Sequence, residues 1–211
     1  MSEDEEVRAR TGTTRREVLK SAGVVLALGL VSRARFGQVA GHVDRATSGG
    51  RLFLRPPGAV DESEFASRCV RCHKCGEGCS NSCIRYVDSE GAVETRGTPY
   101  IVPREKGCML CMKCNNVCPS GALKKVPAKH PRLWELVNMG KARIDKNICH
   151  SENGYICGVC IRACPLRGKA LSAGMWEKPV LNADHCVGCG LCEQACLHMP
   201  QAIRVQPRRR S

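Results

Sequence analysis

Cysteines at regular spacing are the residues of this chain best suited to chemistry. The 211 residues include 17 cysteines, several times ordinary usage. Most of them fall into four motifs of the form Cys-x2-Cys-x2-Cys-x3-Cys, except that the first gap of the third motif spans seven residues. The motifs comprise Cys69, Cys72, Cys75 and Cys79; Cys108, Cys111, Cys114 and Cys118; Cys149, Cys157, Cys160 and Cys164; and Cys186, Cys189, Cys192 and Cys196. Closely spaced thiols in four repeats indicate metal ligation.

This spacing is typical of the cysteine run that ligates [4Fe-4S] clusters in bacterial ferredoxins. Two intervening residues let a tight loop turn three successive thiolates toward one cubane of iron and sulfide. The fourth cysteine, three residues later, is expected on the first turn of a helix and faces a neighbouring cluster. We therefore expect all sixteen motif cysteines to bind the iron of four [4Fe-4S] clusters.

Three other uses of these cysteines fit the pattern less well. Disulfides suit an exported protein, but thiols two residues apart in a tight loop point to a common centre, and 17 is an odd number. Zinc sites usually separate two Cys-x2-Cys pairs by a dozen or more residues, whereas here four cysteines fall within about eleven. The stretch Cys69–His73 also matches a haem-attachment motif. Because it overlaps a complete iron–sulfur motif and does not recur, we interpret that match as coincidence.

Cys83 stands outside the motifs. We interpret it as a buried or free thiol that binds no iron, with replacement of Cys79 as fourth ligand as the alternative. The alternative arises because Cys79 precedes Ser80, where a proline is usual. Cys196 shares this irregularity, since Leu197 follows it.

Three histidines, His150, His185 and His198, lie beside or near motif cysteines. A hydrogen bond from such a ring can tune a cluster, but we interpret them as loop residues exposed to solvent. No nucleophile elbow, phosphate loop or plausible pair of carboxylates accompanies the motifs. The sequence therefore predicts an electron carrier with no catalytic residue.

Short alternating segments flank the motifs and predict strands around each cysteine loop and its short helix. These segments are Gly121–Leu123, Ala142–Asp145, Val180–Asp184 and Ala202–Val205. We predict an α+β fold of tandem bacterial-ferredoxin-like modules, in which paired halves enclose a small core centred on the clusters.

One longer helix is predicted between the second and third motifs, over Pro131–Gly140. Proline suits its first position, glycine its end, and Leu133, Leu136 and Val137 share one face. Trp134 is expected to pack in the core, with capping of a cluster as the alternative.

Composition narrows the classes of protein further. Aromatic residues make up 4% of the chain, beside 21 glycines and 11 prolines, so a large barrel or doubly wound domain is excluded. No apolar run approaches about 18 residues, which excludes a polytopic membrane protein.

The formal charge of +13 suggests a nucleic-acid partner, but four clusters at about −2 each would cancel most of that charge. We expect no nucleic-acid partner, and we interpret Arg208–Arg210 as a solvated end, with docking to an acidic partner or a membrane surface as the alternative.

The N-terminal residues predict export. Thr14–Lys20 fits the twin-arginine pattern, and the apolar stretch Ala22–Val31 has the length of a signal core. We expect a signal or anchor segment at 1–36, a linker at 37–50, and a four-cluster region at 51–211 that holds motifs 69–79, 108–118, 149–164 and 186–196. The twin-arginine route carries folded proteins, so a periplasmic location follows, with retention as a membrane anchor left open.

The chain resembles the NapG/MauM family, the ferredoxin-type proteins of periplasmic nitrate reductase and methylamine-utilisation systems. The resemblance covers nearly the whole chain and rests on the twin-arginine leader, Arg55–Ala59, Glu64–Ala66, Cys69–Cys72, Gly97–Tyr100 and Cys118–Leu123. The stretched third motif is its most specific feature. Cys83 and the missing prolines depart from the family pattern.

The resemblance implies four [4Fe-4S] clusters on the outer face of the cytoplasmic membrane. It also implies two partners, a membrane-bound ferredoxin-type protein that oxidises quinol and a periplasmic electron acceptor. The alternative is an iron–sulfur subunit bound tightly in a molybdopterin oxidoreductase complex, whose four-motif subunits lack the Arg-Pro-Pro-Gly segment. A cysteine-rich structural or nucleic-acid-binding module would require zinc.

Analogy with four-cluster subunits predicts how the motifs pair. The first would pair with the fourth, and the second with the third. Cys79 and Cys196 would then exchange clusters, as would Cys118 and Cys164. A Cys118→Ala variant would damage the cluster of the third motif.

Overall fold

The computed structural model describes residues 52–88 and 93–208. These residues belong to one compact unit, Gly50–Ser211. The expected leader at 1–36 and the linker at 37–50 lie outside the described residues. Within the described part, no helix has the length and apolar character needed to cross a membrane.

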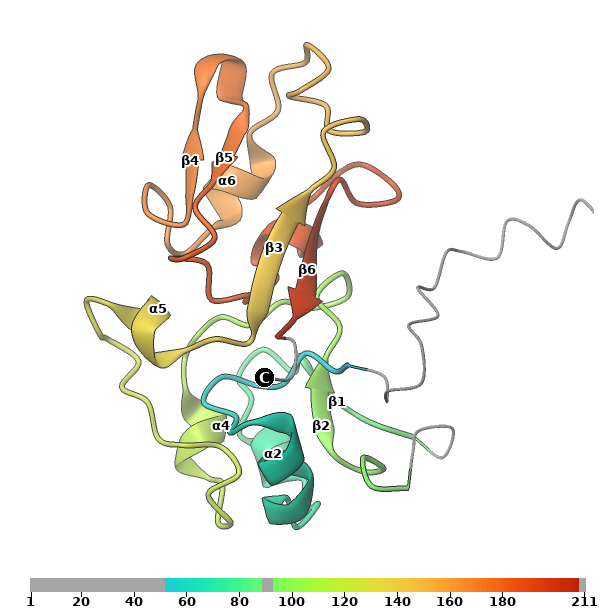
Figure 1. Ribbon diagram of the computed structural model, residues 1–211, viewed down its shortest axis with the longest axis vertical. Helices are drawn as coiled ribbons and strands as arrows, with labels where there is room; N and C mark the ends of the chain where they lie inside the picture. The colour runs from blue at the N-terminus through green and yellow to red at the C-terminus, as the bar shows by residue number, and fades with distance from the viewer. Residues whose placement is uncertain (1–51, 89–92, 209–211) are drawn as a thin grey trace, which may run out of the picture. The chain divides into compact units, whose positions relative to one another are not determined.

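Short helices and short strands alternate along the chain (Figure 1). In order they are α2 (Glu62–Arg68), α3 (Lys74–Glu77), β1 (Ile84–Tyr86), β2 (Pro99–Ile101), α4 (Lys113–Asn116), α5 (Leu133–Leu136), β3 (Gly140–Ile144), α6 (Val159–Ala163), β4 (Leu171–Ala173), the 3-10 turn η1 (Met175–Glu177), β5 (Pro179–Leu181), α7 (Leu191–Gln194) and β6 (Ile203–Pro207). The mixture of helix and strand agrees with the predicted α+β class.

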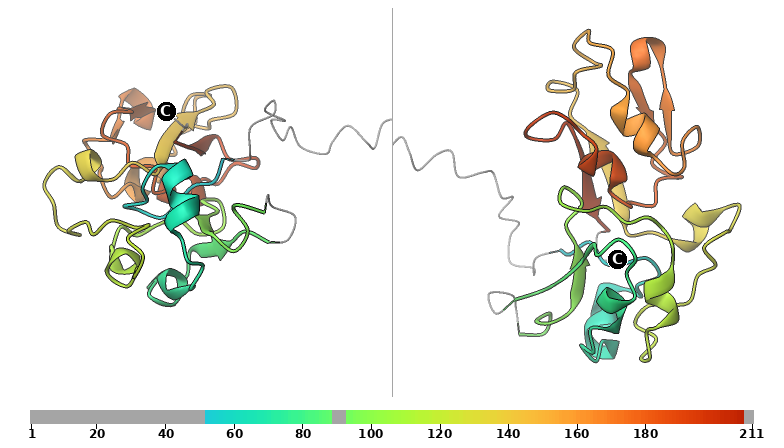
Figure 2. Two further views of the ribbon diagram at one scale, coloured as in Figure 1. Left: turned by 60° about the horizontal axis from the view of Figure 1, so that its bottom comes forward. Right: turned by 180° about the vertical axis from the view of Figure 1, so that it is seen from behind.

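The strands pair within two modules, which we call the first module (52–88 and 93–126) and the second module (140–207). In the second, β3 pairs antiparallel with β6 over five residues, and β4 pairs with β5 (Figure 1 and Figure 2). In the first, β1 pairs with β2, and a single bridge between Ala59 and Leu123 stands where the second module has its longer ladder. The expected strand at Gly121–Leu123 is thus reduced to that bridge.

The expected helix over Pro131–Gly140 is wrong in extent. Only Leu133–Leu136 is helical, and Val137 is already extended at φ −124° and ψ 118°. Gly140 begins β3, where an added Cβ would lie 2.2 Å from the backbone oxygen of Gln206. Close pairing with β6 therefore overrides the local helix signal. Trp134 does pack against the core, as expected.

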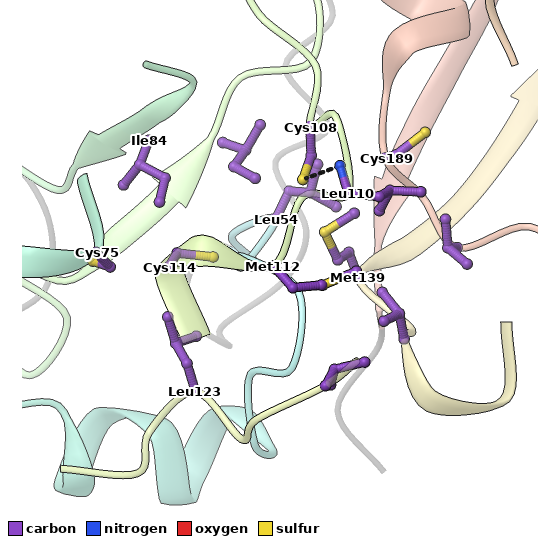
Figure 3. Close-up of a cluster of buried hydrophobic side chains, with 14 of the residues drawn as sticks. Leu54, Cys75, Ile84, Cys108, Leu110, Met112, Cys114, Leu123, Met139 and Cys189 are labelled. Carbon is purple, nitrogen blue, oxygen red and sulfur yellow. Dashed lines mark hydrogen bonds between the residues drawn. The ribbon is translucent and has the colours of Figure 1, made fainter. Parts of the chain in front are cut away.

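Cysteine sulfurs contribute to the buried cores of both modules. Figure 3 draws Cys75, Cys108 and Cys114 in one buried cluster with aliphatic residues such as Leu123 and Met112. Cys186 and Cys192 belong to the smaller cluster of the second module. A chain with few large apolar residues therefore completes its cores with thiols.

A buried ion pair holds the segments together where the chain enters the first module. The Arg55 guanidinium pairs with Glu62 of α2 and donates hydrogen bonds to Thr98 Oγ1 at 2.9 Å and to the Pro99 carbonyl at 2.8 Å. It also lies over the Phe65 ring, 4.7 Å from the centroid. One side chain thus holds the entry segment, α2 and β2 together.

Removal of Arg55 should destabilise the module strongly. Arg55→Ala leaves the Glu62 carboxylate buried without its partner, which typically costs about 3–5 kcal/mol. Anaerobic denaturant titration, followed by circular dichroism of the secondary structure, measures this. Arg85→Ala is the matched control, because its pair with Glu105 is exposed and should contribute at most about 1 kcal/mol. Equal effects of the two substitutions would contradict the assigned role.

Candidate metal centres

Left-handed backbone between the cysteines shapes each binding loop. Positive φ angles occur at Arg71, His73, Leu110, Met112, Gly158, Gly188 and Gly190, with values from 55° to 82°. In the three motifs with regular spacing they fall at the same two places, just before the second cysteine and just after it. These turns bring successive cysteines round to one side of the loop. Four of these residues are not glycine, so the loops hold strain that the rest of the site must offset.

The motif cysteines gather around four cavities, each lined by four of them. Numbered by the motif that supplies three cysteines, these are site 1 (Cys69, Cys72, Cys75 and Cys118), site 2 (Cys108, Cys111, Cys114 and Cys79), site 3 (Cys149, Cys157, Cys160 and Cys196) and site 4 (Cys186, Cys189, Cys192 and Cys164). A larger cavity of about 130 Å³ beside Arg55 has no cysteine in its lining.

The fourth cysteine of each motif lies in a neighbour's site, but the predicted pairing of motifs is wrong. Cys79 and Cys118 exchange sites within the first module, and Cys164 and Cys196 exchange within the second. The physical reason is that α3 contacts α4 and α6 contacts α7, so adjacent motifs face each other. The predicted damage to site 3 by Cys118→Ala is therefore replaced by damage to site 1.

The expected helical position of the fourth cysteine also needs correction. The third cysteine of each motif, such as Cys75 or Cys160, lies within the short helix. The fourth comes after its last residue: Cys79 lies two residues beyond α3, and Cys164 caps the end of α6. The helix thus separates the two cysteines, and they line different cavities.

Burial disfavours the charged thiolate form of several of these cysteines. It raises the pKa of Cys75 to about 11, of Cys114 to about 12, of Cys160 to about 11 and of Cys189 to about 12. Without a positive partner these thiols stay protonated at neutral pH. Bound iron would supply that partner, because metal binding to such thiols releases their protons.

Backbone N–H groups point at cysteine sulfurs in several sites. The N–H groups of Leu110, Ala142 and Ala202 each lie 3.4 Å from a cysteine sulfur, those of Cys108, Cys186 and Cys196. Burial raises the pKa of Cys118, but hydrogen bonds from the Leu123 backbone and the Ser120 hydroxyl outweigh it, so that pKa is lowered. Four soft thiol donors with N–H groups aimed at sulfur fit an iron–sulfur cluster.

A site for a single metal ion would need a different arrangement of ligands. Among residues 52–88 and 93–208, no group of three His, Cys, Asp or Glu side chains is arranged to hold one.

Sites 2 and 4 adjoin each other across the two modules. The N–H of Cys108 donates to the carbonyl of Cys189 at 2.7 Å, and the N–H of Gly107 donates to Gln194 Oε1 at 2.9 Å. Cys189 lies in the same buried cluster as Cys108 and Met139 (Figure 3). The contacts therefore order the sites as 1, 2, 4 and 3.

Burial follows the same order. Five of the eight cysteines at sites 2 and 4 are buried, whereas only one of the eight at sites 1 and 3 is. Cys72 of site 1 is exposed, and every cysteine of site 3 is partly exposed. Sites 1 and 3 are thus the outer sites.

The three histidines have different surroundings. His150 and His198 line site 3, with ring centroids 5.2 Å apart. His185 packs edge-on against Trp134 at 4.6 Å, and its Nδ1 atom is buried without a hydrogen bond. Our interpretation of His185 as a solvated loop residue is therefore wrong, because the aromatic contact covers the ring.

Comparison with known proteins agrees with this arrangement. Residues 68–122 match a 4Fe-4S dicluster domain, which contains the first two motifs, and residues 179–196 match a 4Fe-4S binding domain. The first match spans the two motifs that exchange cysteines in the first module. Iron–sulfur domains of the [4Fe-4S] kind are thus present in this chain.

Relatives extend the similarity over most of the chain. The methylamine utilization ferredoxin-type protein MauM of Methylorubrum extorquens is 34% identical over 92% of this chain and 90% of its own length. MauM of Paracoccus denitrificans is 34% identical over 94% and 90%, and the ferredoxin-type protein NapG of Escherichia coli is 31% identical over 91% and 83%. The cysteine sites and these relatives together show that the chain belongs to the NapG/MauM family of ferredoxin-type proteins.

Proposed function

We propose that the chain carries four [4Fe-4S] clusters, one at each site, and relays electrons along them in the order 1, 2, 4 and 3. The observation that carries this proposal is the contact between sites 2 and 4, where the Cys108 N–H meets the Cys189 carbonyl at 2.7 Å. Without that contact the chain would hold two separate pairs of sites. In this proposal the protein is an electron carrier with no substrate of its own.

The protein contributes ligands, hydrogen bonds and burial. A [4Fe-4S] cluster supplies a one-electron store whose potential depends on charge, hydrogen bonds and exposure. Here the N–H groups of Leu110 and Ala142 reach sulfurs of the inner sites, and Ala202 reaches one at site 3. The inner sites are more buried than the outer ones, which suits internal transfer.

The outer sites are where partners would exchange electrons. At site 1 the Cys72 side chain is exposed, and at site 3 the lining residue Leu197 is 70% exposed. Ile156 and Tyr155, close in sequence to Cys157, are also exposed apolar side chains. A partner that covers them would gain apolar contact beside a ligand set.

We place this relay in the periplasm, between a membrane-bound ferredoxin-type protein that oxidises quinol and a periplasmic acceptor. Support comes from the twin-arginine pattern at Thr14–Lys20 and from family membership. The region 51–211 would then be the exported four-cluster part, and residues 1–36 the leader or a membrane anchor. Two relatives are named for methylamine utilization, and this names a candidate pathway.

Metal analysis of anaerobically purified protein tests the number of clusters. We expect about sixteen iron atoms and about sixteen acid-labile sulfides per chain, four of each per site. About twelve of each would mean that one site is not assembled. Zinc without sulfide would refute the relay, and co-purification of a large catalytic chain would indicate a subunit of an oxidoreductase complex instead.

Paired substitutions test which cysteines share a site. Cys118→Ala and Cys72→Ala should damage the same site, so the double variant should lose no more iron than the more damaged single variant. Cys118→Ala and Cys157→Ala fall in different sites, and their iron losses should add. Iron and sulfide per chain, with electron paramagnetic resonance (EPR) of the reduced protein, measure both. Additive losses in the first pair would contradict the exchange of Cys118 into site 1.

Gly107→Ala tests the contact between the modules. The new Cβ would lie 2.7 Å from the Leu191 nitrogen and 2.9 Å from the Gly190 carbonyl carbon, and such crowding costs about 1–3 kcal/mol. We expect full iron content but weaker magnetic coupling between clusters in EPR spectra of the reduced protein. Gly174→Ala is the control, because its nearest neighbour is the Val180 side chain at 3.1 Å. Unchanged coupling in Gly107→Ala would contradict the proposed link.

A further inference from the structure

Cys83 occupies a position that belongs to alanine in the other three sites. After each fourth cysteine the chain loops and then enters a strand or bridge through a buried pair of residues. These pairs are Ala122 and Leu123 after Cys118, Ala170 and Leu171 after Cys164, Ala202 and Ile203 after Cys196, and Cys83 and Ile84 after Cys79. Each pair lines the same cavity as its fourth cysteine. The internal repeat thus makes Cys83 the counterpart of three alanines.

The Cys83 side chain lies among the ligands of site 2. It is 4% exposed, and its sulfur lies 3.5 Å from the sulfur of Cys79. It also lines the same cavity as Cys108, another cysteine of the site. Site 2 therefore holds five thiols, whereas sites 1, 3 and 4 hold four each.

Packing alone does not require a sulfur atom here. A buried cysteine often serves as a small apolar residue. Yet Ala122, Ala170 and Ala202 are equally buried, at 1–4% exposure, and fill the equivalent place without a thiol. The thiol is thus an addition to this one site.

We propose that Cys83 is a second, exchangeable ligand for the iron that Cys79 holds at site 2. The proposal rests on the proposed function, because it requires a [4Fe-4S] cluster at that site. In the exchange, the bond between iron and the Cys79 sulfur breaks, and a bond between iron and the Cys83 sulfur forms. The proton of the Cys83 thiol passes to Cys79, and no electron is gained or lost.

The geometry suits this exchange. The two sulfurs already lie at hydrogen-bonding distance, so the proton needs no intermediate carrier. Cys79 is partly exposed and Cys83 is buried, so the two ligand sets differ in their contact with solvent. Site 2 would retain four thiolate ligands when Cys79 is displaced or modified.

Three variants of the full chain, purified anaerobically, test the proposal: Cys79→Ala, Cys83→Ala and the double variant. Cys83→Ala restores the residue found in the other repeats and should keep the wild-type iron and sulfide content. Cys79→Ala should keep that content too, with a changed EPR signal because Cys83 now binds the iron. The double variant should lose between about one and four iron atoms per chain, as one ligand or one whole cluster is lost. Equal iron loss in Cys79→Ala and the double variant would overturn the proposal.

Site 1 provides the matched control, because Ala122 stands at the position of Cys83. Cys118→Ala should lose iron where Cys79→Ala does not. Cys118→Ala with Ala122→Cys transplants the extra thiol and should regain the lost iron. Failure of the transplant to regain it would contradict the equivalence of the two positions.

The wild-type metal content separates this proposal from the proposed function. A wild-type chain with about sixteen iron atoms and sulfides supports four clusters, whatever Cys79→Ala does. If the wild-type chain lacks sulfide, the relay and the exchange are both refuted. If the wild-type chain has its full iron and sulfide but Cys79→Ala loses iron, the relay stands and the exchange is refuted.

Discussion

The exchange of fourth cysteines between adjacent motifs is the constraint on which the rest of this structure depends. Because Cys118 lines site 1 and Cys79 lines site 2, neither motif can complete a site alone. The short helices must therefore pack in pairs, and the strands that flank them must pair as well. With few aromatic residues available, metal ligation would stabilise this arrangement where a larger domain would use apolar burial.

The sequence predicted the features that depend on neighbouring residues and missed those that depend on contacts between distant segments. Cysteine spacing identifies three members of each site, since a loop of two residues turns them toward one centre. The partner of each fourth cysteine depends on which helices pack, and analogy with other four-cluster proteins selected the wrong pairs. The helix expected up to Gly140 failed for the same reason, because pairing with β6 begins there. Left-handed backbone at Leu110 and Met112 carries no signal in residue type.

In the sequence, the Arg55–Ala59 segment indicates only a family resemblance. In the structure this segment is attached to α2 and β2, because Arg55 is buried among Glu62, Thr98 and the Pro99 carbonyl. Pro56 and Pro57 are among the most fully buried side chains. This segment therefore serves folding, by fixing the chain that precedes the first cysteine loop.

The two modules differ in how their outer edges are closed. The second has a five-residue ladder between β3 and β6, whereas the first has a single bridge between Ala59 and Leu123. Segments with fewer interstrand hydrogen bonds open at lower free energy than those with a full ladder. If clusters occupy the four sites as proposed, we expect sites 1 and 2 to be the first to admit oxygen and chelators, and the last to close during assembly. On the proposed function, the edge of the first module would set how long the whole chain keeps its iron.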